Sequence, residues 1–348
     1  MKYPLSVGII GASGYTGEEL VRLLSQHSKI RIDVITSRKH VGKALHQIIP
    51  KMRNRMPNIL FTDPKPEILA NSNTELFFLS LPHGIASNYA IPLIKAGKTV
   101  IDLSADYRLF SKEAYLDYYD TEHPDPKMLI NAPYGLAERT NDKAIKQTPL
   151  IACPGCYPTS ILLPLLPLVE NKIVNTNNIV INSFSGVSGA GKRTSESLLY
   201  SECSENTVAY GVGNHRHLSE IEEQLSFVSK SGQKIVVQFT PHLAPMKRGI
   251  LSTIVLPLDK GITLKSVYKT WHQCYAKKPF ICILPSGEYP QTKYVSGTNR
   301  IDFSGHYDQR TNNLIITSAI DNLIKGAGGQ GIQIMNMKYG FEETDGLL

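Results

Sequence analysis

The residue with the most distinctive chemical setting is Cys156, in the segment CPGCYPTS at residues 153–160. Gly155 permits a sharp turn before it, and proline, threonine and serine then lead into the apolar run 161–163, a pattern typical of a helix start. A thiol at the N-terminus of a helix faces unsatisfied N–H groups and the positive end of the helix dipole. This setting lowers a thiol pKa and favours the thiolate. Cys156 is therefore predicted to be a nucleophile, and the protein an enzyme.

The spacing of Cys153 and Cys156 also fits two other kinds of site. A redox dithiol has this spacing, but here the pair follows a long nucleotide-type domain instead of opening a small thioredoxin-like unit. A zinc site that adds His215 and His217 lacks a second Cys-x-x-Cys pair and the usual histidine spacing. We therefore interpret Cys156 as a nucleophile, predict no metal site and leave the role of Cys153 open.

Proton carriers and cations cluster in two later segments. His215-Arg-His217 precedes an acidic run that we predict to be helical from residue 221, and residues 241–249 form a predicted proline-rigid loop with His242 and Arg248. An imidazole beside a thiolate can take or donate a proton near neutral pH. The clustering favours His217 as the proton partner of the thiol, and less strongly His215 and His242.

Near the N-terminus, the glycine-rich segment GASGYTG at residues 11–17 lies between an apolar strand at 5–10 and a helix pattern at 18–24. In the order strand, glycine turn, helix, the glycines let the backbone approach a pyrophosphate, which rests on the helix N-terminus. An ordinary strand-to-helix turn is the alternative. The cofactor contacts predicted in this loop are Gly11, Ser13, Gly14, Tyr15, Thr16 and Gly17.

The second strand, at residues 30–35, ends in Thr-Ser-Arg-Lys rather than in an acidic residue. An NAD site would place a carboxylate there for the ribose 2′-hydroxyl, whereas hydroxyls and cations suit a 2′-phosphate. NADP(H) is therefore the predicted cofactor, with Ser37 and Arg38 as contacts. A solvated loop is the alternative for Arg38 and Lys39, and Asp33, which lies earlier in the strand, is predicted to have a structural role.

Further strands at residues 76–81 and 99–103, with a helix at 85–96, predict an α/β fold with a Rossmann-like, doubly wound parallel sheet. Pro82 and the segment 104–108 follow the strand ends, where such sheets bind ligands. After Cys156, strand patterns joined by long connections predict an α+β catalytic and dimerisation domain. The strands are expected at residues 178–184, 234–239, 249–256 and 313–318.

Length and composition set the remaining limits. The 348 residues favour two domains: residues 1–155, completed by 320–348, and residues 156–319. The net charge of +7 comes from scattered residues with no Lys/Arg block, so no nucleic-acid partner is predicted. No apolar run is long enough to span a membrane, and the start lacks a signal-peptide pattern. Five cysteines, an odd number, favour reduced thiols and a cytoplasmic location.

Together these segments resemble the N-acetyl-gamma-glutamyl-phosphate reductase family, the acyl-phosphate reductases of arginine biosynthesis. The resemblance implies a semialdehyde dehydrogenase fold, NADP, a homo-oligomer (a dimer or, more usually, a tetramer), Cys156 as nucleophile and His217 as acid/base partner. The segment PGCYPT at 154–159 is the most specific match, since the first glycine loop alone would also fit aspartate-semialdehyde dehydrogenase. The matching residues are 11–17, 102–108, 154–159, 185–191, 215–217, 241–246 and 325–330.

The mechanism that follows has the Cys156 thiolate attack the acyl carbon of a small-molecule acyl phosphate, giving a thioester that hydride reduces to the aldehyde. Arg108, His215 and Arg248 are the predicted contacts for the substrate phosphate and carboxylate. Ser188 and Gly189, in a predicted glycine-rich loop at 185–193, and Asn322 are assigned to the cofactor. Alternatives are an aspartyl-phosphate or aminoadipate-type substrate, or a non-catalytic NADP-binding protein.

Overall fold

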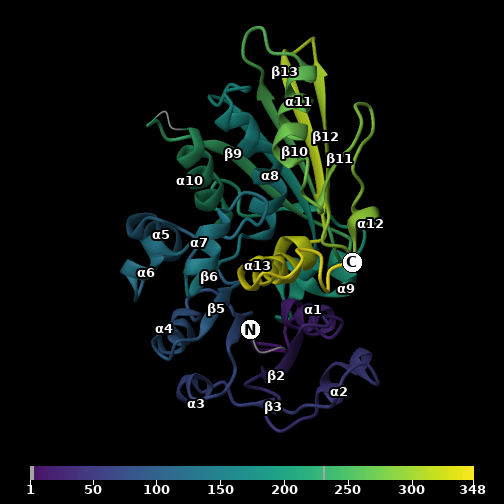
Figure 1. Ribbon diagram of the computed structural model, residues 1–348. Helices are drawn as coiled ribbons and strands as arrows, with labels where there is room; N and C mark the ends of the chain where they lie inside the picture. The colour runs from purple at the N-terminus through teal and green to yellow at the C-terminus, as the bar shows by residue number, and fades with distance from the viewer. Residues whose placement is uncertain (1–3, 230–231) are drawn as a thin grey trace. The chain divides into compact units, whose positions relative to one another are not determined.

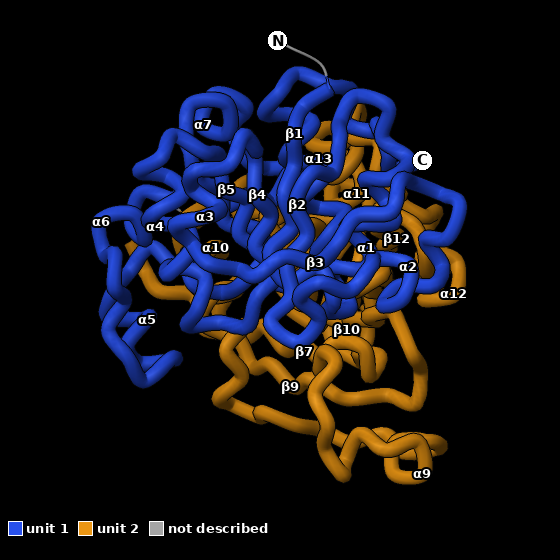
Figure 2. Tube along the Cα trace, turned by 90° about the horizontal axis from the view of Figure 1, so that it is seen from below, with its two compact units in different colours: residues 1–155, 327–348 blue, residues 156–326 orange. Residues whose placement is uncertain are grey.

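The structure is a computed structural model of the chain and describes residues 4–229 and 232–348 (Figure 1). The chain divides into two compact units (Figure 2). Unit 1 holds the residues up to 155 together with 327–348, and unit 2 holds residues 156–326. The change from one unit to the other falls between Gly155 and Cys156, and the chain returns to unit 1 at Ala327 rather than at the expected residue 320.

Unit 1 is built on a six-stranded sheet in the order β3-β2-β1-β4-β5-β6, and every pairing in it is parallel. This confirms the predicted Rossmann-like sheet. The strand order reverses between β1 and β4, where such sheets open a ligand crevice at their carboxyl ends. The strands are β1 (Leu5–Ile10), β2 (Ile30–Thr36), β3 (Phe61–Thr62), β4 (Leu76–Leu79), β5 (Thr99–Asp102) and β6 (Leu150–Ala152).

Strands β1, β4, β5 and β6 of this sheet are buried along most of their length, because helices cover both of its faces. The last helix of the chain packs against α1 and α7 of the same unit. The helices of unit 1 are α1 (Tyr15–Leu24), α2 (Leu45–Ile48), α3 (Pro66–Ala70), α4 (Ser87–Lys95), α5 (Lys112–Tyr119), α6 (Pro126–Asn131), α7 (Asp142–Gln147) and α13 (Gly329–Tyr339), with a short 3-10 turn at Pro50–Met52.

Unit 2 is built on a seven-stranded mixed sheet in the order β11-β12-β13-β10-β7-β9-β8. Its strands are β7 (Ile179–Gly186), β8 (Val208–Ala209), β9 (Val237–Ala244), β10 (Ile250–Pro257), β11 (Ile281–Ile283), β12 (Ile301–Asp308) and β13 (Asn313–Ile320). Its helices are α8 (Cys156–Glu170), α9 (Tyr200–Cys203), α10 (His217–Ser229), α11 (Leu264–Tyr275) and α12 (Thr292–Val295). Short 3-10 turns lie at Val187–Ala190 and Glu196–Leu198, and a π-helical turn at Ile324–Gly328 leads out of the unit.

The predictions of loops at residues 185–193 and 241–249 are wrong in part, because the first residues of each segment belong to strands. β9 continues through Pro241 and His242 to Ala244, and Ser185 and Gly186 end β7 before a 3-10 turn. β7 pairs with β9 along its whole length, but on the other side of β9 only the two-residue β8 lies beside it, so a missing N–H on that side costs few ladder bonds and Pro241 is tolerated. The sequence also gave no signal for β12, whose polar and glycine residues interrupt the apolar alternation.

Helix α8, which begins at Cys156, contains two internal prolines, Pro164 and Pro167. Each proline removes the donor for the carbonyl four residues earlier. Side chains from the same unit replace both donors. Ser318 of β13 donates to the carbonyl freed by Pro164 at 2.7 Å, and Tyr275 of α11 donates to the one freed by Pro167 at 2.5 Å. The helix that carries Cys156 is therefore fixed by its neighbours at the two points where its own ladder is broken.

Replacing Tyr275 by phenylalanine should lower the free energy of unfolding by about 1–3 kcal/mol, since it leaves a buried carbonyl without its donor. Chemical denaturation of the wild type and the variant measures this. The control is Tyr289→Phe, at an exposed tyrosine, for which we expect a change within about 0.5 kcal/mol. Equal unfolding free energies for Tyr275→Phe and the wild type would show that the α8 carbonyl finds another donor.

Candidate active site

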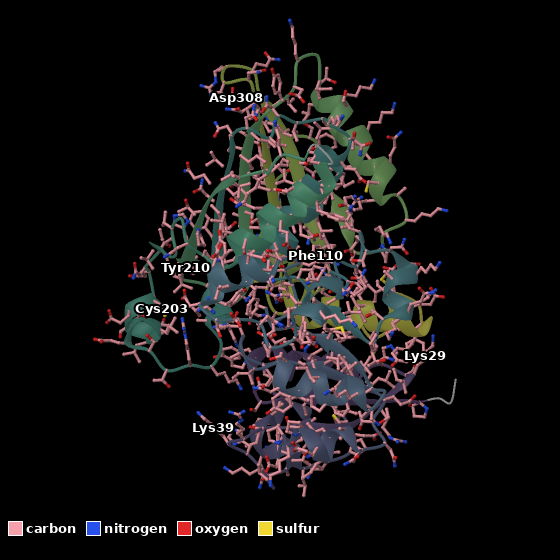
Figure 3. All side chains as sticks on the ribbon, turned by 90° about the vertical axis from the view of Figure 1, so that its left-hand side faces the viewer. Lys29, Lys39, Phe110, Cys203, Tyr210 and Asp308 are labelled. Carbon is pink, nitrogen blue, oxygen red and sulfur yellow. The ribbon has the colours of Figure 1, made fainter. Side chains whose placement is uncertain are left out.

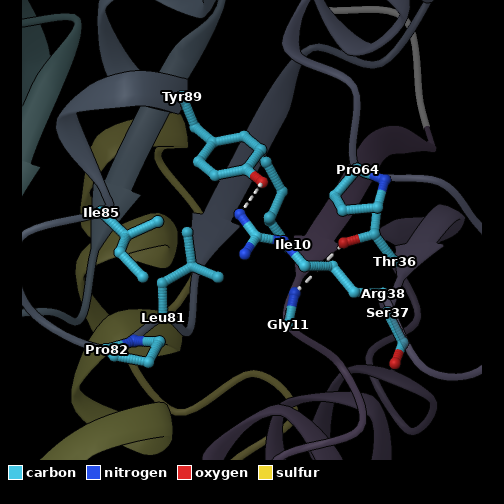
Figure 4. Close-up of a pocket in the computed structure, with 10 residues that line it drawn as sticks. All are labelled: Ile10, Gly11, Thr36, Ser37, Arg38, Pro64, Leu81, Pro82, Ile85 and Tyr89. Atoms are coloured by element: carbon cyan, nitrogen blue, oxygen red, sulfur yellow. Dashed lines mark hydrogen bonds between the residues drawn. The ribbon is translucent and has the colours of Figure 1, made fainter.

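Unit 1 contains a cavity of about 200 Å³ at the carboxyl ends of β1, β2 and β4 (Figure 4). This is the crevice that the reversal of strand order predicts. Of the predicted cofactor contacts, Gly11, Ser37, Arg38 and Pro82 line it directly. The full lining is Ile10, Gly11, Thr36, Ser37, Arg38, Pro64, Leu81, Pro82, Ile85 and Tyr89.

The glycines of the first loop serve two different purposes. Gly11 has a φ of +87°, and a Cβ there would lie 2.3 Å from the Ser80 carbonyl oxygen, while a Cβ at Gly17 would lie 2.4 Å from the carbonyl oxygen of Gly11. Packing alone requires these two glycines. A Cβ at Gly14 would lie 3.6 Å from its nearest neighbour, the carbonyl oxygen of Gly11, which is an ordinary contact. The missing side chain at Gly14 therefore leaves backbone open at the N-terminus of α1, which fits a pyrophosphate.

Hydroxyls and a cation lie at the end of β2. The Ser13 and Ser37 hydroxyls are hydrogen-bonded at 2.9 Å, and the exposed Arg38 donates from its guanidinium to the Tyr89 hydroxyl at 3.5 Å, as the dashed line in Figure 4 shows. The Tyr89 ring therefore holds the guanidinium beside the cavity. This donor set suits a phosphate better than an uncharged hydroxyl.

Asp33, the one acidic residue of β2, is engaged elsewhere. Its carboxylate accepts hydrogen bonds from the Arg31 guanidinium at 2.5 and 3.0 Å and from the Ser6 hydroxyl. The Arg31 guanidinium and the Ser6 hydroxyl lower the pKa of Asp33 against a burial effect that would raise it. This agrees with the prediction that Asp33 has a structural role.

Buried carboxylates hold the turn that follows β4. Asp106 accepts hydrogen bonds from the backbone N–H groups of Gly84 at 2.6 Å and Ala86 at 2.8 Å, which fixes the residues after Pro82 and the start of α4. Burial, and then the nearby Asp106, raise the pKa of Asp102. The segment 104–108 therefore positions one wall of the cofactor cavity through backbone contacts.

Arg108 was predicted to contact the substrate, and its surroundings favour a different role. Its side chain is buried, and it donates to the backbone carbonyls of Cys153 at 2.7 Å and Leu103 at 2.9 Å. Two of its donors are thus committed to the backbone. Arg108 braces the strand end that leads toward Cys156.

Cys153 is fully buried, and burial raises the pKa of its thiol to about 12. A thiol in this environment stays protonated at neutral pH, so it is a poor nucleophile and a poor metal ligand. The redox-pair interpretation of the Cys-x-x-Cys spacing is therefore disfavoured.

Cys156 is the first residue of α8 and is half-buried, so the predicted helix start is confirmed. A Cβ at Gly326 would lie 2.7 Å from the Cβ of Cys156, so the glycine leaves room for the cysteine. Burial, with a contribution from the charge of Cys156, raises the pKa values of Tyr157 and Tyr210. Both phenols thus lie close enough to Cys156 for a charge on its sulfur to act on them.

Beside Cys156, the Tyr157 and Tyr210 hydroxyls are hydrogen-bonded to each other at 2.9 Å. Tyr157 is buried, and the Ser185 hydroxyl also bonds to it. The pKa of Tyr210 is raised to about 12, so its hydroxyl stays neutral. Tyr210 follows β8 at one edge of unit 2 (Figure 3). Sequence reasoning missed both tyrosines: only the pairing of β8 with β9 brings Tyr210 to a residue 53 positions earlier.

His217 is the first residue of α10, which begins four residues earlier than the predicted start at 221. Its ring centroid lies 5.8 Å from that of Tyr157 and 4.9 Å from that of His215. Helices α8 and α10 pack together and begin at Cys156 and His217. Tyr157, the neighbour of Cys156, therefore links the starts of the two helices.

His242 lies on the other face of the sheet from this cluster. Phe239 of β9 contacts Tyr157 edge-on, with centroids 5.3 Å apart, whereas His242, three residues later, points the opposite way and stacks on Phe184 at 4.7 Å. Successive side chains of a strand point to opposite faces of the sheet, so residues three apart, such as Phe239 and His242, lie on opposite faces. His242, the weaker candidate for proton transfer, is thereby separated from the thiol's neighbours by the sheet.

Three other predicted contacts lie within unit 2. Arg248 forms an ion pair with the fully buried Asp321 at 3.0 Å, so part of its charge is already balanced. The Asn322 side-chain amide donates to the Ser188 hydroxyl at 3.0 Å, and its oxygen accepts the N–H of Gly249 at 2.8 Å. Ser188 and Asn322 are thus brought together, with Gly189 close to the same amide.

Within residues 4–229 and 232–348, no group of three or more histidine, cysteine, aspartate or glutamate side chains is arranged to hold a metal ion. No helix in the described part of the chain is long and apolar enough to cross a membrane.

Comparison with known protein families matches both halves of the chain. Residues 6–148 match the model described as semialdehyde dehydrogenase, NAD binding domain, and residues 156–322 match the model described as semialdehyde dehydrogenase, dimerisation domain. Among curated proteins, the N-acetyl-gamma-glutamyl-phosphate reductase of Akkermansia muciniphila is 45% identical over 345 residues, 99% of this chain and 98% of that protein. The reductase of the same name from Desulforamulus reducens is 43% identical over 343 residues, again 99% and 98% of the two chains.

Solved structures show the same fold at much lower identity. Aspartate semialdehyde dehydrogenase II from Vibrio cholerae superposes with a TM-score of 0.72 at 17% identity, covering 98% of this chain and 99% of that one. The aspartate semialdehyde dehydrogenase of Candida albicans, solved with NADP, gives a TM-score of 0.70 at 18% identity and covers 96% and 98%. These likenesses establish the architecture of the chain.

Proposed function

We propose that this chain, which belongs to the N-acetyl-gamma-glutamyl-phosphate reductases of the semialdehyde dehydrogenase family, reduces N-acetyl-L-glutamyl 5-phosphate to N-acetyl-L-glutamate 5-semialdehyde and phosphate in arginine biosynthesis. The observation that carries the proposal is the reactive-cysteine segment. Cys156 begins a helix, Tyr157 connects it to the His215–His217 segment, and curated reductases of that name match the chain over 99% of its length.

In the first half of the proposed reaction, the Cys156 thiolate attacks the acyl carbon of the substrate. A C–S bond forms, the bond to the phosphate oxygen breaks, and phosphate leaves with its electron pair. Cys156 suits this step because it is half-buried at a helix N-terminus, whose N–H groups can stabilise the oxyanion formed during attack. The product of this half-reaction is a thioester on Cys156.

In the second half, a nicotinamide cofactor held with Ser37 and Arg38 among its contacts would supply the hydride that reduces the thioester carbon. His217 donates a proton to the resulting oxyanion and takes it back as the C–S bond breaks, so that aldehyde leaves and the thiolate returns. An imidazole can exchange protons in this way near neutral pH, and His217 lies at the start of α10 beside the Tyr157 ring. The neutral Tyr157 and Tyr210 hydroxyls add hydrogen-bonding groups without adding charge next to the thiolate.

NADP(H) is the cofactor that the cavity of unit 1 fits best. Ser13, Ser37 and Arg38 place two hydroxyls and a guanidinium at the end of β2, where an NAD site would have a carboxylate. Tyr89 holds that guanidinium at the edge of the cavity.

Arg38→Met should weaken NADP(H) binding by about 10- to 100-fold, the scale of one lost hydrogen bond to a charged group, and leave NAD(H) binding nearly unchanged. Titration calorimetry with both cofactors measures this. Lys39→Met is the matched control, because Lys39 is exposed and lies outside the set that lines the cavity. An equal loss for both cofactors would contradict a contact with the 2′-phosphate.

We also propose that the chain forms a homodimer or homotetramer through unit 2. One face of its sheet packs against α8, α10 and α11. The other carries a half-buried apolar set that a second copy would cover: Val180, Phe184, Leu251, Val255 and Ile315. A monomer at micromolar concentration in sedimentation equilibrium would contradict this.

The five free thiols suit a cytoplasmic location, where thiols stay reduced, and a disulfide in protein isolated from cells would argue against that location.

The test of function is NADP⁺ reduction by purified protein with N-acetyl-L-glutamate 5-semialdehyde, in the presence and absence of phosphate. We expect turnover that requires phosphate and exceeds turnover of aspartate semialdehyde and of an aminoadipate-type semialdehyde. Preference for either of those aldehydes would reassign the substrate. Cofactor binding without turnover of any of the three would instead indicate a binding protein.

A further inference from the structure

The imidazole of His215 is held in one orientation. Its ring lies edge-on to Tyr157 and Tyr210, with centroids 5.5 Å from each, and to Phe239 at 5.6 Å. Gly211, in the segment just before His215, packs tightly against the ring. It has a φ of +56°, and a Cβ at Gly211 would lie 3.3 Å from both Cβ and Cδ2 of His215. A ring enclosed on these sides has little freedom to turn.

In this orientation His215 caps helix α10. Its Nδ1 accepts the backbone N–H of His217 at 3.1 Å, and its carbonyl accepts the N–H of Leu218 at 2.9 Å. These N–H groups belong to the first two residues of the helix, which have no acceptor within the helix itself. The side chain of His215 therefore accepts a backbone N–H at the start of the helix, as the side chain of a capping serine or aspartate does in other helices.

The cap also determines where the ring carries its proton. A nitrogen that accepts an amide hydrogen must be unprotonated, so the neutral ring has its hydrogen on Nε2. A charged ring would carry hydrogen on both nitrogens and would lose the cap. Burial, and then the charge of Arg216, lower the pKa of His215 to about 4, so the ring stays neutral at the pH where the enzyme would work. The groups that surround the ring are the neutral phenols of Tyr157 and Tyr210, Phe239 and His217.

We infer that His215 is a positioning residue: its neutral imidazole, through Nδ1, fixes the first residue of α10 and thereby the place of the His217 side chain. This rests on the proposed function for its catalytic consequence, and it replaces the earlier assignment of His215 to substrate binding. Without the cap, the first turn of α10 would fray and His217 would lose its fixed place beside Tyr157.

The first test reads the ring itself and needs no substrate. Long-range ¹H–¹⁵N spectra of histidine-labelled protein, with the His215 signals identified by their loss in His215→Asn, distinguish the two ring nitrogens. We expect an unprotonated Nδ1 and a protonated Nε2 from pH 5 to 9. Hydrogen on Nδ1, or a ring that becomes charged within this range, would overturn the inference.

The second test separates capping from substrate contact with a matched pair. Asparagine places an oxygen near the position of Nδ1, whereas glutamine places its amide near Nε2. We expect His215→Asn to retain kcat and the pH profile, and His215→Gln to lower kcat by about 10-fold with little change in KM, the scale of a lost helix cap. The opposite order, with glutamine active and asparagine impaired mainly in KM, would assign His215 to the substrate.

The two tests fail independently. If the wild type does not turn over N-acetyl-L-glutamate 5-semialdehyde, the proposed function fails, and the ring spectra still decide whether His215 caps α10. If the wild type is active and Nδ1 carries hydrogen, the proposed function stands and the positioning role falls. His272→Asn, at an exposed histidine of α11, controls for the loss of a histidine elsewhere in unit 2 and should match the wild type in kcat and KM.

Discussion

Cys156→Ser is expected to reduce phosphate-dependent turnover of N-acetyl-L-glutamate 5-semialdehyde by about 10³-fold or more, because a hydroxyl replaces the thiolate that we propose forms the covalent intermediate. Serine keeps the size and the helix-start position of the side chain, so cofactor affinity and the unfolding midpoint should change little. The measurement is kcat with saturating cofactor, together with NADP(H) affinity by titration.

Cys153→Ala is the matched control within the same segment. Its thiol is buried with a pKa raised to about 12, and only its backbone carbonyl contacts Arg108, so activity should persist. Comparable loss in both cysteine variants would revive a dithiol mechanism. Wild-type activity in Cys156→Ser would remove the nucleophile assignment altogether.

His217→Asn should lower kcat by roughly 10²–10⁴-fold, the usual scale of general acid–base catalysis, with a smaller effect on KM. The reason is positional: His217 begins α10 and lies beside Tyr157, the residue next to Cys156. One ionisation should also disappear from the pH–rate profile of kcat/KM. Steady-state kinetics from pH 5 to 9 measure both effects.

The comparison variant is His242→Asn, which removes an imidazole stacked on Phe184 across the sheet. It should leave the rate and the profile as they are in the wild type. A change of only a few-fold in His217→Asn would show that another group moves the proton. Since the Tyr210 hydroxyl is bonded to that of Tyr157, Tyr210→Phe would then be the next variant to measure.

Much of unit 1 was predictable because its signals are local. The strand at 5–10, the glycine turn at 11–17 and the following helix are adjacent in sequence, and each has a distinct pattern. The sheet order and the position of the cavity follow from them by general rules for parallel sheets. Cys156 was predictable for the same reason, since glycine, proline and hydroxyl residues around it mark a helix start.

The roles of the charged and aromatic residues were less predictable, because they depend on distant partners. Arg108 looks like an anion-binding residue in the sequence, and only the fold brings the Cys153 carbonyl to it. His215 and His217 look equivalent as neighbours, and only the start of α10 gives one the cap and the other the first helical position. Tyr210 gave no signal, because it follows an edge strand of only two residues.

The proposed reaction requires a covalent intermediate at Cys156, and mass spectrometry can detect it directly. The protein is incubated with N-acetyl-L-glutamate 5-semialdehyde and NADP⁺ without phosphate, so that the thioester forms and has no phosphate to take the acyl group. After rapid acid quench and digestion, the peptide containing Cys156 should carry the mass of one N-acetylglutamyl group, which phosphate added before the quench removes. An active enzyme that yields an unmodified Cys156 peptide, or the acyl group on another residue, would show that Cys156 does not form the thioester.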